Sequence, residues 1–177
     1  SGLAGGVYAP TRLMIIGTTL YVADNNYGSH INTYDKDRGA FIEALPNMNH
    51  NWKGLTGITT DGTKIYAADE ERILKVDFTG LIESWMGKVA NNSGMSGNVG
   101  CNTLNSNENT PGWCIGGTGK GGLDADSFIR TRAIAYDGNG NILVSGERYP
   151  GVKKFNASTG QLQGIIALED NSPSEWT

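Results

Sequence analysis

The sequence predicts an all-β fold of short antiparallel strands, and three observations support this prediction. First, 26 of the 177 residues are glycine, about twice the average usage, with no collagen period and no Gly/Ser linker run. This excess indicates many turns, and a chain with many turns has many short strands. Second, no segment shows a convincing helical period. Third, the chain contains an internal repeat.

The repeat consists of three segments that superpose on one another. Their cores are Leu13–Asp24, Gly57–Asp69 and Arg132–Gly146. Asp24 and Asp69 lie 45 positions apart in the sequence. The third segment follows at a longer interval, because an insertion rich in glycine and asparagine separates it from the second.

Each segment follows the same order of elements. A short apolar strand, a tight turn, a second strand, an alternating third strand and a fourth strand come one after another. Four antiparallel strands every 40 to 45 residues are typical of a propeller blade. We therefore predict a single β-propeller-like domain over 1–177, a half or partial propeller of about three four-stranded blades. The blades lie at roughly 8–46, 52–87 and 124–168, and a long insertion loop occupies 88–123.

The middle segment, GITTDGTKIYAADEERILKVDFTG, closely resembles the NHL repeat. The first segment resembles it well, and the third less so, because Ser145 and Gly146 replace its Ala-Asp. NHL-like propellers usually have six blades, and this chain encodes about three. The resemblance therefore implies that the chain is part of a longer propeller or associates with copies of itself. We expect self-association, as a dimer or a trimer, because an open arc leaves apolar faces at both ends.

Cys101 and Cys114 lie 13 positions apart in a segment with little apolar surface. A disulfide closing this loop would stabilise the fold by about 3 kcal/mol, and it would indicate an oxidising compartment. The alternative is two free thiols in a reducing compartment. Zinc is disfavoured, because the two histidines lie far upstream. The insertion also resembles cysteine-containing loops in secreted NHL-like proteins of environmental and predatory bacteria. We therefore expect a secreted or cell-surface protein.

Charge and motifs exclude several classes of function. The net charge is −4, and without a Lys/Arg cluster we expect no nucleic-acid partner. No apolar run is long enough for membrane insertion. The chain has neither a P-loop nor a G-x-S-x-G nucleophile elbow, and we expect no cofactor and no catalytic site. Asp24 and Asp69 recur at the repeat interval, so we expect them to accept N–H groups of the following turns. Asp137–Asn141 is expected to be a hairpin turn rather than a calcium loop.

Candidate ligand-binding residues are aromatic, histidine or arginine side chains in polar segments between strands. Exposed rings among amides and hydroxyls are suited to stacking on sugars. Trp113 has an equally weighted alternative role, which is to plug the disulfide loop onto a blade edge. The candidates are Tyr27, His30, His50, Trp52, Trp113, Arg132 and Tyr149.

These observations predict a non-catalytic extracellular binding or adhesion module that recognises a glycan or a cell-surface polymer. It could stand at a fibre tip or serve as an adhesin domain. One alternative is a secreted propeller hydrolase or lyase with a metal site, built from His30, His50, Asp24 and Asp69. The other is a protein–protein interaction segment of a longer propeller.

Overall fold

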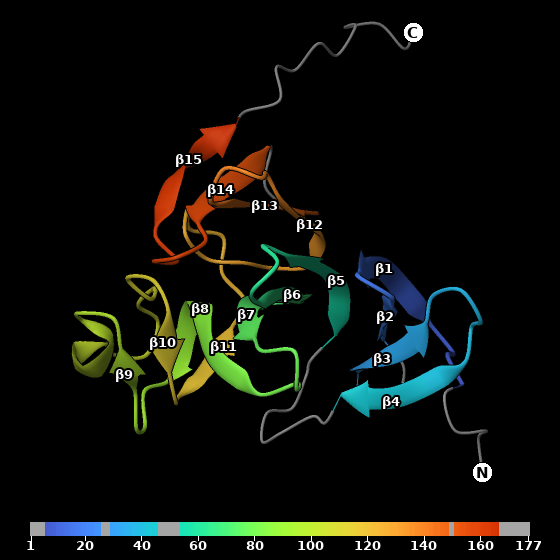
Figure 1. Cartoon of the computed structure of the whole chain (residues 1–177). Helices are drawn as coiled ribbons and strands as arrows, with labels where there is room; N and C mark the ends of the chain where they lie inside the picture. Colours follow the sequence, from blue (N-terminus) through green and yellow to red (C-terminus); the bar gives the residue numbers. More distant parts are fainter. Residues whose placement is uncertain (1–5, 26–28, 46–53, 149–150, 167–177) are drawn as a thin grey trace, which may run out of the picture.

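Figure 1 shows the computed structural model of the chain, which describes residues 6–25, 29–45, 54–148 and 151–166. Within those residues the regular elements are strands, apart from one short 3-10 helix at Cys101–Thr103. The predicted all-β fold is therefore confirmed. No helix in the described part is long and apolar enough to cross a membrane.

Three antiparallel sheets form the framework, and the first four strands of each pair in chain order. The first sheet consists of β1 (Pro10–Ile16), β2 (Thr19–Asp24), β3 (His30–Asp35) and β4 (Phe41–Leu45). The second sheet consists of β5 (Leu55–Thr60), β6 (Ile65–Asp69), β7 (Arg72–Val76) and β8 (Ile82–Asn91). The third sheet consists of β12 (Thr131–Tyr136), β13 (Asn141–Gly146), β14 (Val152–Asn156) and β15 (Leu162–Ile166).

The sheets are arranged as the blades of a partial propeller. Their first strands lie close together, with β1 and β12 both packing against β5. The fourth strands, β4, β8 and β15, lie at the periphery of the arc (Figure 1). Gly57 allows the close approach of β12 to β5, because a Cβ at this position would lie 3.1 Å from Cγ2 of Ile134.

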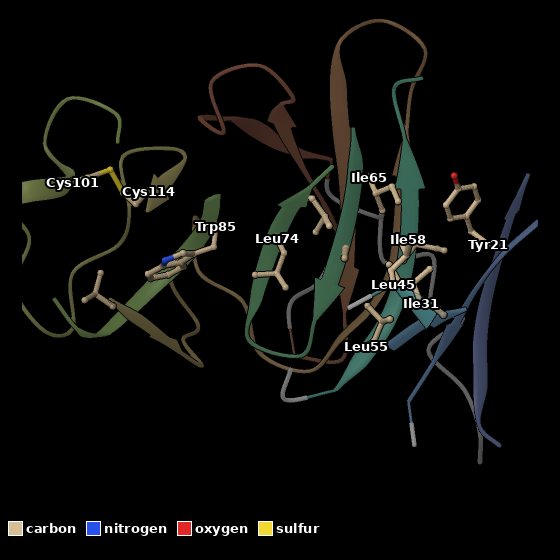
Figure 2. Packing of buried hydrophobic residues seen from close by; sticks show 14 of the residues in the cluster. Tyr21, Ile31, Leu45, Leu55, Ile58, Ile65, Leu74, Trp85, Cys101 and Cys114 are labelled. Atoms are coloured by element: carbon tan, nitrogen blue, oxygen red, sulfur yellow. A yellow bond between two sulfur atoms is a disulfide. The ribbon is translucent and has the colours of Figure 1, made fainter. Parts of the chain in front are cut away.

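Successive side chains of a strand face opposite sides of its sheet, and in the second sheet both sides are buried. Tyr66 and Ala68 face the third sheet, whereas Ile65 and Ala67 face the first. Figure 2 shows the cluster between the first two sheets, where Tyr21, Ile58 and Ile65 lie close together. The core is therefore two apolar layers between three blades.

The insertion is more regular than the predicted loop. β8 continues to Asn91, and three short strands follow: β9 (Ser96–Gly97), β10 (Cys114–Ile115) and β11 (Thr118–Lys120). Both β10 and β11 pair with β8, so the insertion extends the second sheet beyond its fourth strand. The Cys101–Cys114 disulfide is confirmed, with the two Cα atoms 5.7 Å apart. Backbone pairing with β8 provides an order that composition alone did not predict.

The recurring aspartates have the structural role that their repeat interval indicated. Oδ1 of Asp24 accepts the N–H of Ala9 at 2.9 Å, and Oδ1 of Asp69 accepts the N–H of Gly54 at 2.9 Å. Each donor lies immediately before the first strand of its sheet. The prediction was wrong in one detail, because these donors precede the sheet rather than lying in the following turn. Each carboxylate thus links the residue that precedes the first strand of its sheet to the end of the second strand.

Asp69 also forms a buried ion pair, since its Oδ2 lies 2.8 Å from Nε of Arg72 and both side chains are nearly inaccessible to solvent. In the third sheet Gly146 stands at the corresponding position. There the N–H of Thr131 donates to the carbonyl of Glu70 at 3.0 Å, so the entry of the third sheet is tied to the second sheet.

Lys153 is buried in β14, at the position that Leu74 occupies in β7. Its Nζ donates to the carbonyls of Asp124 and Ser127, at 2.9 and 2.6 Å, and lies 5.7 Å from the ring centre of Phe128. Burial lowers the pKa of Lys153 from 10.5 to about 8, although Asp126 and Asp124 partly oppose this shift. The ammonium group fixes the 124–128 segment against the third sheet.

Replacing the Asp69 carboxylate should destabilise the chain strongly. Asp69→Ala leaves the buried Arg72 guanidinium without this partner and removes the acceptor of the Gly54 N–H. Breaking such a buried pair costs about 3–5 kcal/mol, and we expect a loss of that size in denaturant unfolding. The control is Asp37→Ala in the exposed β3–β4 turn, with an expected effect below about 0.5 kcal/mol. Equal effects of the two variants would contradict the anchoring role.

Stability should depend on pH through Lys153. Between about pH 8 and 10.5 the unfolded chain holds this proton and the folded chain does not, so the free energy of unfolding rises with pH in that window. We expect the wild type to gain on the order of 2–3 kcal/mol relative to Lys153→Met across it. Urea unfolding of both proteins at each pH measures the difference. A constant difference would contradict the lowered pKa.

Candidate functional site

A polar pocket lies where the second and third sheets begin. It has a volume of about 270 Å³ and is lined by Thr56, Glu70, Arg130, Thr131 and Arg132. We call it the arginine pocket. Ligand pockets are commonly about 300–1,000 Å³, so this one is of a size for a single small group, such as one sugar ring of a longer chain.

β-Bulges orient two of the lining residues. The pairing of β5 with β6 skips Thr56, and the pairing of β12 with β13 skips Arg132. The pairing of β1 with β2 skips Thr11 in the same way. A bulge turns its extra side chain out of the regular alternation. The same local defect therefore recurs at the start of all three sheets and presents Arg132 at the rim of the arginine pocket.

Hydroxyl groups at these bulges also link successive sheets. Oγ1 of Thr11 donates to the carbonyl of Leu55 at 2.9 Å. Oγ1 of Thr56 lies 3.0 Å from Oγ1 of Thr131, within hydrogen-bonding distance. The floor of the arginine pocket is thus a contact between two blades, and its shape depends on how the blades pack.

Charges of both signs meet at the arginine pocket. Glu147 forms ion pairs with Arg130, at 3.2 Å, and with Arg132. Both arginine side chains remain exposed, at 59% and 61%. Glu70 adds a second carboxylate to the lining. Two arginines are therefore matched by two glutamates, so the site offers hydrogen-bond donors and acceptors together rather than a net positive charge.

Two lining residues have backbone conformations that side chains rarely adopt. Glu70 has φ 42° and Arg130 has φ 47°. For residues other than glycine these angles are uncommon and tend to cluster at functional sites. The strain is offset locally, because the carbonyl of Glu70 accepts the N–H of Thr131 and the carbonyl of Arg130 accepts the N–H of Glu147.

His30 lies at the start of β3, on the same edge of the arc as the arginine pocket but on the first sheet. Its Nε2 is 3.9 Å from Oδ2 of Asp24. That carboxylate is buried and accepts the N–H groups of Tyr8 and Ala9. His30 is therefore positioned by an anchoring aspartate, and it is not among the lining residues of the arginine pocket.

Trp113 is buried, with 4% of its surface exposed. Its Nε1 donates to the carbonyl of Ala157 at 2.9 Å, and its ring stacks on Tyr66 at a centroid distance of 5.9 Å. Lys75 Nζ lies 5.7 Å from the ring centre. With its ring covered in this way, Trp113 does not present an open surface for stacking on a sugar. It holds the insertion against the third sheet, as the alternative role proposed.

Of the remaining candidates, Tyr27, His50, Trp52 and Tyr149 lie outside the described residues. Among the predicted ligand-binding residues that the structure describes, Arg132 is the one that lines the pocket. Sequence reasoning missed its partners Thr56, Glu70, Thr131 and Glu147.

Asp137–Asn141, expected to be a hairpin turn rather than a calcium loop, forms the turn between β12 and β13. One carboxylate oxygen of Asp137 accepts the N–H groups of Asn139 and Asn141, and the other accepts the side-chain amide of Asn141. Within the described ranges, no three His, Cys, Asp or Glu side chains form a group that could hold a metal ion.

No protein-family model matches the chain, and no curated protein matches it. The resemblance to the NHL repeat thus has no support from a family match. Solved structures similar to the chain include a quinohemoprotein alcohol dehydrogenase from Comamonas testosteroni, at 14% identity and a TM-score of 0.47. A europium-containing methanol dehydrogenase is similar at 15% identity and a TM-score of 0.48. Each similarity covers 93% of this chain, but only 21% and 26% of the respective dehydrogenase. The description of three propeller blades rests on the strand pairing and packing given above.

Proposed function

We propose that the chain is a non-catalytic extracellular binding module, of the NHL-like kind, that recognises a glycan or a cell-surface polymer. The observation that supports this most is the arginine pocket, where two exposed guanidinium groups, two carboxylates and two hydroxyls converge. An adhesin role is part of the proposal. The disulfide supports a secreted or cell-surface location, since disulfides persist in oxidising compartments.

Sugar hydroxyls suit this set of groups. Arginine only donates hydrogen bonds, an ionised carboxylate only accepts them, and a hydroxyl does both. A pair of neighbouring hydroxyls can therefore accept from Arg132 while donating to Glu70. A phosphate or sulfate group would accept from the arginines but would be repelled by Glu70 and Glu147. The pocket thus favours a neutral polyhydroxylated group over an anion.

Of the four residues of the enzyme alternative, His50 lies outside the described residues, and Asp24 and Asp69 have structural roles in this fold. Asp24 and Asp69 are buried and accept backbone N–H groups at the sheet entries. His30 Nε2 lies 3.9 Å from Oδ2 of the anchored Asp24. A binding role for the arginine pocket does not require Asp24, Asp69 or His30 to react. The exposed side chains of Arg130 and Arg132 remain available to contact a ligand.

Binding to immobilised neutral and acidic oligosaccharides tests the proposal. We expect a neutral glycan to bind, and we expect Arg132→Gln and Glu70→Gln each to weaken that binding about tenfold or more, as the loss of a hydrogen bond to a charged group predicts. The control is Lys36→Gln, which removes one positive charge from the exposed β3–β4 turn and should leave binding unchanged.

Two outcomes would contradict the proposal. Absence of binding to every glycan tested would exclude this ligand class. Binding that Glu70→Gln strengthens while Arg132→Gln abolishes would identify the ligand as an anion, against the balance of donors and acceptors in the pocket.

A further inference from the structure

Glu70 in the arginine pocket has an equivalent residue in each of the other two sheets. Asn25, Glu70 and Glu147 each follow the second strand of their sheet directly. Each donates its backbone N–H to the carbonyl of the residue that precedes the first strand, at 3.0, 3.0 and 3.2 Å respectively. The three side chains therefore begin from the same place in the three blades, and their contacts can be compared directly.

Two of the three equivalent side chains have partners within the chain. Oδ1 of Asn25 accepts the hydroxyl of Ser29 at 3.0 Å. Glu147 forms ion pairs with both arginines of the pocket. The Glu70 carboxylate, in contrast, has neither an ion pair nor a hydrogen bond within the residues that the structure describes. It is therefore the carboxylate of the arginine pocket that is open to a ligand.

The Glu70 side chain is nevertheless held in a defined place. Its Cγ and Cδ would each lie 3.0 Å from a Cβ at Gly54, so the side chain lies directly over this glycine. The backbone of Glu70 is fixed on both sides, because its N–H donates to Gly54 and its carbonyl accepts the N–H of Thr131. The missing side chain at Gly54 thus leaves the room in which the Glu70 carboxylate stands at the pocket. An acceptor that is positioned before a ligand arrives costs little to order on binding.

The charges around Glu70 favour a positively charged partner. Glu70 is partly buried, and a carboxylate is bound most strongly by a group that both carries positive charge and donates hydrogen bonds. Arg130 and Arg132 do not fill this role, since both are paired with Glu147. The net charge of the chain is −4, which raises the local concentration of cations rather than anions.

We propose that the arginine pocket is specific for an amino sugar whose primary amine is free and protonated, with the ammonium group bound by Glu70. This inference rests on the proposed glycan-binding function and names the class of sugar. The ammonium group donates to Glu70, while hydroxyls of the same ring accept from Arg132. Acetylation of the amine removes the positive charge, and a sugar without an amine offers Glu70 only a neutral hydroxyl.

Three oligosaccharides with the same β-1,4 backbone test the proposal. Oligomers of glucosamine, N-acetylglucosamine and glucose differ in the group at carbon 2, which is an ammonium, an acetamide or a hydroxyl group. Titration calorimetry at mildly acidic pH, where the amines are protonated, measures their affinities. We expect the glucosamine oligomer to bind about tenfold more tightly than the other two, because an ion pair with a partly buried carboxylate adds Coulomb attraction to the hydrogen bond.

Two substitutions test whether Glu70 recognises the amine. Glu70→Gln removes the negative charge, so this variant should bind the glucosamine and glucose oligomers with equal affinity. Gly54→Ala places a methyl group where the Glu70 side chain lies and should reduce the preference while Glu70 itself is unchanged. The matched control is Gly164→Ala, where a Cβ meets nothing within 4 Å, and it should keep the full preference. Neither glycine has a φ in the left-handed region, so circular dichroism should show both variants folded.

The possible outcomes separate this inference from the proposed function. Equal affinity of the wild type for the three oligomers, with binding that Arg132→Gln weakens, would overturn the amino-sugar assignment and leave glycan binding intact. A preference for the amine that Glu70→Gln does not change would overturn the role of Glu70. Displacement by propylamine as effective as displacement by glucosamine would show that the sugar ring is not recognised, and would overturn the assignment as well. Absence of binding to every oligosaccharide would overturn both proposals.

Discussion

The structure depends on one constraint: a four-stranded sheet whose side chains alternate between two apolar faces must have both faces covered. The second sheet meets this condition entirely within the chain, because Ile65 and Ala67 pack toward the first sheet while Tyr66 and Ala68 pack toward the third. Burying apolar surface on both sides contributes the main stabilisation of such a layer. The central blade therefore fixes the other two, and the arrangement in Figure 1 follows from its alternation.

Polar contacts at the strand starts determine how the covered layers are aligned. Asp24 and Asp69 tie the entries of the first two sheets to their second strands, and Thr11 and Thr56 link each of these sheets to the next one. These contacts are short and directional, whereas apolar packing alone would tolerate sliding between sheets. The arginine pocket forms at this edge because the bulges that orient the threonines also orient Arg132.

The fold was largely predictable from the sequence, because the patterns that specify one blade are short stretches of sequence that recur in the others. The Gly-rich turns, the alternation in β7 and the interval between Asp24 and Asp69 each recur, so one blade predicts the next. The site was not predictable in the same way. Glu70 and Arg130 owe their places to positive φ angles that their residue types do not indicate. Glu147 reaches the arginines only through the pairing of β12 with β13.

The insertion shows why composition alone was a poor guide to order. Its many Gly and Asn residues predicted a loop, but β10 and β11 bind the open edge of β8, where backbone groups are otherwise unpaired. In Figure 2 Trp85 of β8 lies between Leu74 and the Cys101–Cys114 disulfide, and it is nearly inaccessible to solvent.

Ala44 and Ile165 occupy the position of Trp85 in the other two sheets, and both are exposed. In the second sheet the insertion covers the ring of Trp85, whose Nε1 donates to the carbonyl of Gly116. Trp113 fixes the same insertion to the third sheet, because its Nε1 donates to the carbonyl of Ala157. The insertion therefore completes the outer edge of the central blade.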